Sequence, residues 1–128
     1  REEFFLYWED ADFCLRSSKL GVPILVALDI EVWHAVGGSQ RQPGAVGRSS
    51  DYYYYMQRNR LILFKACVKK PSFWFGLGLL QILHPIMRIA FLERSDRLEK
   101  LHAIKQGLID GLRGSTGKRI GAPRLSGR

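Results

Sequence analysis

The apolar segment at residues 73–92 most constrains how this chain can fold, because so long an apolar run must be covered by protein or by lipid. Its length matches the roughly 20 residues of a membrane-spanning helix. However, Gln81, His84 and Arg88 share one face of a helical wheel, and a lipid-exposed span would have to hide this polar stripe at considerable cost. The opposite face is apolar and consists of Leu79, Leu83, Ile86 and Ala90. We therefore expect an amphipathic helix.

Three arrangements of this helix remain open: it lies in a membrane interface, packs on a soluble domain, or spans a bilayer. We favour the interfacial arrangement, in which Phe73, Trp74 and Phe75 act as aromatic anchors. Basic residues around the segment would then meet anionic headgroups. They are Lys69, Lys70, Arg88, Arg94 and Arg97.

The net charge of +8 is unevenly distributed along the chain. Residues 1–51 contain five Lys or Arg against eight Asp or Glu, a net charge of −3, whereas residues 52–128 contain 15 against four, a net charge of +11. A basic C-terminal part favours an anionic partner, which membrane phosphates, nucleotide-sugar phosphates or nucleic acid could supply. Cys14 and Cys67 match no Cys-x-x-Cys motif and suggest a reducing compartment.

Two further helices are expected on either side of the apolar segment. Residues 51–70 form one that must end before Pro71, because proline disfavours the helical conformation of the residue before it. Ser95 is a suitable N-cap for a last helix that ends near Arg113, with apolar residues at helical spacing. The sequence beyond Gly114 is rich in Gly, Ser, Arg and Lys, which predicts a flexible basic tail.

Residues 22–34 are predicted to be extended. The apolar run at residues 22–28 has the length of a buried strand, and residues 30–34 alternate as a half-exposed one. The glycine- and serine-containing residues 37–50 form a loop, either a plain connector or a lid in which Arg41 and Arg48 contact phosphate.

An acid-rich helix start follows an aromatic run near the beginning of the chain. Phe4 to Trp8 lead into Glu9, Asp10 and Asp12, and a helical pattern then continues to Gly21. Acidic side chains are favoured in a first helical turn, so the cluster could be a plain capping arrangement. Clustered carboxylates beside apolar side chains also suit a general base, because burial and like charges tune proton affinity.

The sequence from Phe4 to Arg16 resembles the acceptor-side motif of glycosyltransferase family 2, inverting sugar transferases that include bacterial rhamnosyltransferase-like enzymes. Further similarities follow in the expected order along nearly the whole chain. They lie at residues 32–34, 37–39, 54–61 and 107–114.

The resemblance implies a role for several residues. Asp10 would be the catalytic base, Glu9 its acidic neighbour, and Trp8 a wall of the acceptor pocket. The tyrosine- and arginine-rich segment at residues 52–60 would lie near the donor phosphates and the acceptor, where arginine binds phosphate in bidentate fashion. The substrate-binding residues implied there are Arg58, Asn59 and Arg60, with Arg60 the least firmly matched.

His34 would be a metal ligand by the same resemblance. It would share Mg or Mn with an Asp-x-Asp motif that lies upstream in the family and is absent from this chain. Imidazole is a good ligand for divalent metals. The alternative is a histidine at a strand end that hydrogen-bonds to a backbone carbonyl.

The fold that the resemblance implies is α/β: the C-terminal part of a GT-A (nucleotide-diphospho-sugar transferase) domain, mainly helical here, with two or three short strands. Residues 1–70 would form the acceptor-side part of a truncated catalytic domain, residues 71–114 amphipathic membrane-associated helices, and residues 115–128 the basic tail. Because a family-like motif begins at once after Arg1, we expect a longer protein and an inactive fragment.

The expected function is transfer of a sugar from a nucleotide-sugar donor to a saccharide or lipid-linked acceptor, with inversion, in bacterial cell-surface polysaccharide or glycolipid synthesis. The expected location is the cytoplasmic face of the cell membrane, as a peripheral protein. The alternative is a non-catalytic, basic, membrane-peripheral binding module. We expect no nucleic-acid partner, because no recognised module accompanies the aromatic and basic residues at 52–60.

Overall fold

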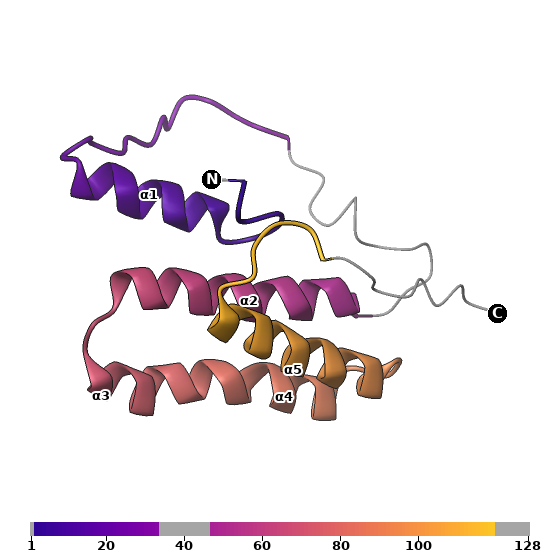
Figure 1. Ribbon diagram of the computed structural model, residues 1–128. Helices are drawn as coiled ribbons and strands as arrows, with labels where there is room; N and C mark the ends of the chain where they lie inside the picture. Colours follow the sequence, from indigo (N-terminus) through magenta and orange to yellow (C-terminus); the bar gives the residue numbers. More distant parts are fainter. Residues whose placement is uncertain (1, 34–46, 120–128) are drawn as a thin grey trace.

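The computed structural model describes residues 2–33 and 47–119, and all regular secondary structure within them is helical (Figure 1). Helix α1 spans Glu9–Lys19 and α2 spans Ser50–Cys67. A short α3 (Pro71–Phe73) continues through a π-helical stretch (Trp74–Gly78) into α4 (Leu79–Leu92), and α5 spans Arg97–Arg113. The predicted helices at 51–70 and up to Arg113 are thus confirmed, with α2 ending three residues early. The N-cap position of α5 is occupied by Asp96, so the prediction of Ser95 as the N-cap is wrong.

The expectation of an α/β fold with short strands is wrong for the described residues, which contain no strand. The segment at residues 22–33, which should have supplied the strands, is irregular, and every side chain in it is exposed. A strand needs a neighbour to pair its N–H and C=O groups, and a single extended run is not stable by itself. The apolar pattern at residues 22–28 therefore failed as evidence for a sheet.

Helix α2 is the centre of the molecule. Ser49 caps it by accepting a hydrogen bond from the backbone N–H of Tyr52 at 3.1 Å. Tyr53, Tyr54 and Tyr55 are all buried, and with Ile89, Ala103 and Ile104 they form the core. Because three successive helical residues point in different directions, α2 must be covered on several sides.

Helix α5 packs very closely against α2. Gly107 and Gly111 face it one turn apart, and a Cβ atom on Gly107 would overlap the carbonyl oxygen of Tyr54. A Cβ atom on Gly111 would lie 2.8 Å from the carbonyl oxygen of Arg58. Both glycines are therefore required by the approach of the two backbones.

Helix α4 runs along the edge of the molecule below α2 in Figure 1, beside α5. Pro85 and Ile89 are its buried residues, and most of its leucines are exposed. The continuous helical stretch Pro71–Leu92, 22 residues long, is apolar and long enough to cross a membrane by length and composition, and only 17% of its most apolar window is buried.

Candidate functional site

The acid-rich start of α1 follows a backbone turn of unusual conformation. We call residues Tyr7–Asp10 the acid turn. Tyr7 and Trp8 have φ angles of 66° and 69°, in the left-handed region that non-glycine residues rarely adopt. Each such residue costs about 1–3 kcal/mol and persists only where its surroundings hold it in place. Conformations of this kind cluster at functional sites.

Asn59 holds the acid turn from α2. Its side-chain amide nitrogen donates to the carbonyl oxygens of Leu6, at 2.7 Å, and Tyr7, at 3.1 Å. The side chain is fully buried, and its own oxygen accepts a hydrogen bond from Nε of Arg58 at 2.8 Å. A residue expected to bind substrate thus directs its hydrogen-bonding groups to the backbone just before Trp8.

Arg58 extends this hydrogen-bond chain toward both ends of the described chain. Its Nη1 donates to the carbonyl oxygen of Gly117 at 2.6 Å and its Nη2 to that of Glu3 at 3.4 Å. The guanidinium carbon also lies 4.9 Å from the centre of the Tyr55 ring, within cation–π distance. Arg58 is buried, so its charge acts here on protein groups.

The three carboxylates in the first turn of α1 lie in different surroundings. Glu9 and Asp10 are exposed, and Asp10 Oδ1 accepts a hydrogen bond from the backbone N–H of Ala11 at 2.7 Å. Asp12 is buried and forms an ion pair with Arg16, at 2.8 Å. Two acids are therefore presented at the surface, while the third stabilises α1.

Trp8 lies beside these acids as part of an aromatic cluster. Its ring packs edge-on against Phe64, with centroids 5.8 Å apart, and Phe64 in turn contacts Phe73 and Trp74. The Trp8 indole nitrogen is buried, and within the described residues it has no hydrogen-bond partner. An unsatisfied buried donor of this kind is uncommon in native proteins.

Arg60 points away from the acid turn. It is buried toward α4, donating from Nη1 to Gln81 Oε1 at 2.9 Å and from Nη2 to Gln57. Burial lowers the pKa of its guanidinium to about 10. The structure therefore gathers Trp8, Glu9, Asp10 and Asn59 around one turn, with Arg58 behind them, and leaves Arg60 elsewhere.

The predicted metal ligand His34 lies outside the described residues, as does Arg41. Within residues 2–33 and 47–119, no group of three or more His, Cys, Asp or Glu side chains could hold a metal ion. The metal prediction therefore remains untested by this geometry.

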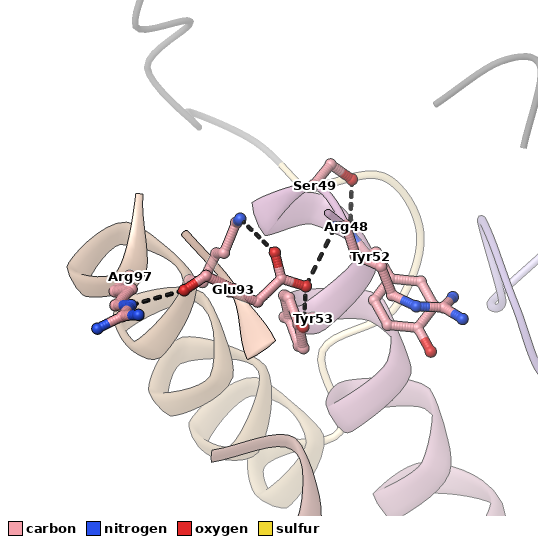
Figure 2. Close-up of polar contacts among 7 residues, drawn as sticks. Arg48, Ser49, Tyr52, Tyr53, Glu93 and Arg97 are labelled. Carbon is pink, nitrogen blue, oxygen red and sulfur yellow. Dashed lines mark hydrogen bonds and ion pairs between the residues drawn. The ribbon is translucent and has the colours of Figure 1, made fainter. Parts of the chain in front are cut away.

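Sequence reasoning missed a buried carboxylate, Glu93, at the end of α4 (Figure 2). It accepts hydrogen bonds from Tyr53 Oη and Lys100 Nζ, both at 2.8 Å, and from the backbone N–H of Arg48 at 3.2 Å. Burial alone would raise the pKa of Glu93, but the hydrogen bonds from Lys100 and Tyr53 outweigh it and hold that pKa below its usual value. Burial and the Glu93 hydrogen bond raise the pKa of Tyr53 to about 12.

This network joins α2, α4 and α5, and its role is structural. Its sequence signal was weak, because Glu93 follows the end of α4 and Lys100 lies in α5, so no helical spacing connects them. Only the burial of both side chains in the folded chain distinguishes the Glu93–Lys100 ion pair.

A second candidate site lies between α2, α5 and residues 115–119. It is an open cavity of about 470 Å³ whose lining includes Arg113, Lys118 and Arg119 beside Asp110. Asp110 accepts a hydrogen bond from Tyr54 Oη at 2.7 Å, and Arg119 pairs with Asp51 at 3.6 Å. Several of its polar groups thus already bind protein partners.

Comparison with known proteins identifies a distant relative. The chain is 25% identical over 119 residues to the dTDP-rhamnosyl transferase RfbF of Shigella flexneri, an alignment that covers 91% of this chain and 40% of the relative. The chain therefore spans less than half of that relative's length. No protein-family model matches the sequence, and no solved structure matches it. The similarity indicates a relationship to glycosyltransferases.

Proposed function

We propose that this chain is the acceptor-side part of a glycosyltransferase, in which Asp10 accepts the proton of the attacking hydroxyl group. The observation that carries the proposal is the strained acid turn, held by the buried amide of Asn59 and presenting two exposed carboxylates. The similarity to a rhamnosyl transferase over 91% of the chain supports the same reaction class.

The chemistry explains why a carboxylate is needed. An acceptor hydroxyl is a poor nucleophile that must lose its proton as it attacks the sugar, so a positioned base accelerates the step. Asp10 lies in the first turn of α1, with Trp8 beside it as an apolar wall for a sugar ring. Glu9 presents a second exposed carboxylate next to Asp10 at the start of α1.

The donor side of the reaction requires other groups. A departing nucleotide diphosphate accumulates negative charge, which a divalent metal or fixed cations stabilise. His34 is the residue of this chain proposed as a ligand for Mg or Mn. The described residues are assigned to the acceptor side only.

The proposed partners are a nucleotide-sugar donor and a saccharide or lipid-linked acceptor, in the synthesis of bacterial surface polysaccharide or glycolipid. The relative's name specifies a dTDP-rhamnosyl donor, and for this chain the donor class is a nucleotide-sugar. Inversion at the anomeric carbon follows from direct attack by a single activated hydroxyl.

The decisive experiment is a transferase assay on the whole protein with Asp10→Asn. The variant removes the proton acceptor and preserves the side-chain shape, so turnover should fall by about 100-fold or more while donor binding stays near normal. Glu99→Gln, which changes an exposed carboxylate on α5, is the matched control and should retain activity. Near-normal turnover of Asp10→Asn would reject Asp10 as the base.

A further inference from the structure

Helix α4 has an apolar face that points away from the protein. We define the apolar face as Leu79, Leu80, Leu83, Met87 and Phe91, which lie within one sector of a helical wheel. Their side chains are 44–73% exposed. Phe75, just before α4, is 84% exposed. An exposed patch of this kind is rare on a protein surrounded by water alone.

The core-facing side of α4 is apolar as well, since its buried residues are Pro85 and Ile89. Polar groups lie along one flank of the helix: Gln81, itself exposed, accepts a hydrogen bond from buried Arg60 of α2, and Nε of Arg88 is buried without a hydrogen-bond partner among the described residues. A surface helix of a water-soluble protein has one apolar stripe, toward the core, and a polar opposite face. In α4 the face opposite the core is also apolar, which suits an apolar environment outside the protein.

Exposed cations flank both ends of this helical stretch. Lys69 and Lys70 precede α3, and Arg94 and Arg97 follow α4. Positive charge at both ends of an apolar face matches a surface that is apolar with an anionic rim, as a bilayer with acidic headgroups is. A protein partner would have to supply both properties along a 14-residue helix.

The apolar surface continues into a groove between α4 and α5. The groove has a volume of about 330 Å³ and is lined almost entirely by aliphatic side chains, with Lys105 at its rim. These side chains are Ile86, Leu101, Ile104, Leu108, Ile109 and Leu112. The dimensions and lining suit part of one acyl chain.

We propose that the apolar face of α4 docks this protein onto an anionic lipid surface, with the helix lying in the plane of the membrane. A spanning arrangement is disfavoured because α4 contacts α5 and is hydrogen-bonded to α2. Inserting α4 would draw buried polar groups such as Gln57 and Arg60 into hydrocarbon. This inference concerns a surface on the far side of α2 from α1 and does not depend on the role of Asp10 (Figure 1).

The test is flotation of the 128-residue chain with vesicles of phosphatidylcholine, with and without phosphatidylglycerol. The chain should float with the anionic vesicles. The double variant Leu80→Gln/Met87→Gln should lower partitioning by about 30-fold or more, because two large apolar side chains no longer enter lipid. Leu28→Gln, which changes a 93% exposed leucine outside α4, is the matched control and should bind normally.

The electrostatic part of the proposal has its own variant. Lys69→Gln/Lys70→Gln should weaken binding to anionic vesicles by about fivefold per charge at low salt. The difference from the unmodified chain should shrink as salt is added, because ions screen exposed charges. Equal binding of the variant and the unmodified chain at low salt would show that Lys69 and Lys70 do not contact anionic headgroups.

Several outcomes would overturn lipid docking itself. They are failure of the folded chain to float, an equal loss of binding in Leu28→Gln, and resistance to alkaline carbonate extraction, which would indicate a span. A second copy of the chain is the rival occupant. Dimerisation without lipid that Leu80→Gln/Met87→Gln abolishes, together with no flotation, would assign the apolar face to self-association.

Discussion

Asn59 donates its amide hydrogens to the carbonyl oxygens of Leu6 and Tyr7, residues that precede it by more than 50 positions. Without those two hydrogen bonds, nothing local in the sequence favours left-handed conformations at Tyr7 and Trp8, since both residues are bulky. The family resemblance identified Asn59 as a candidate for substrate binding. In the structure it sets the backbone that carries Glu9 and Asp10.

Asn59→Ala should therefore destabilise the fold and the acid turn together. The variant removes both hydrogen bonds to the carbonyl oxygens of Leu6 and Tyr7 and leaves the buried Nε of Arg58 without its acceptor, which should lower the free energy of unfolding by about 2–3 kcal/mol. Urea denaturation measures the loss. Ser18→Ala, at an exposed position of α1, should change stability by no more than about 0.5 kcal/mol. Equal stability of Asn59→Ala and the unmodified chain would contradict this account.

The elements show what a single sequence can and cannot specify. The helices α2 and α5 were predictable, because Pro71 and the apolar spacing after Ser95 are local signals. The strands expected at residues 22–34 were wrong in the described part, because a strand depends on partners elsewhere and an apolar run alone does not supply them. For the site, Glu9 and Asp10 were visible as a motif, whereas the hydrogen bonds of Arg58 and Asn59 to distant backbone were not.

Close packing of α2 and α5 gives a sharp prediction at this scale. Gly107→Ala adds a methyl group that overlaps the Tyr54 carbonyl, so the helices must separate, at a cost of about 2–3 kcal/mol. Gly76→Ala is the matched control, because a Cβ there meets nothing within 4 Å. Alanine should be neutral at Gly76 or stabilise by up to about 1 kcal/mol, as expected from helix propensity.

Thermal unfolding of the two glycine variants measures the contrast. A Gly107→Ala protein as stable as the Gly76→Ala protein would show that α2 and α5 have room to adjust, contrary to the packing described here.

At the scale of the whole molecule, the Glu93 network joins α2, α4 and α5 and should make stability depend on acid. The pKa of Glu93 is lower in the folded chain than its ordinary value of 4.5. Its contribution is therefore fully present above about pH 4.5 and is lost as the pH falls toward its folded pKa, because protonation removes the charge that pairs with Lys100.

Glu93→Gln should be less stable at neutral pH by about 3 kcal/mol, since it leaves the buried Lys100 ammonium without its counter-charge. It should also lose much of the acid sensitivity below about pH 4.5. Thermal melts across this range measure both effects, with Glu99→Gln as an exposed control. Parallel stability profiles for the Glu93→Gln and unmodified proteins would contradict the assignment.

The hydrogen-bond chain from the acid turn through Asn59 and Arg58 to Gly117 also has a consequence for the coupling between distant parts of the chain. Its partners lie 52–59 residues apart in sequence on either side of α2, so each of these hydrogen bonds requires a long loop to close, whereas a helix forms between neighbouring residues. Pairing of α2 with α5 closes a loop of similar length, since Gly107 packs on Tyr54, 53 positions away. The acid turn depends in addition on the backbone at residues 3 and 117, which both accept hydrogen bonds from Arg58. The acidic pair is thus linked to both ends of the described chain, and an opening of the chain near residue 117 is transmitted to it through two side chains.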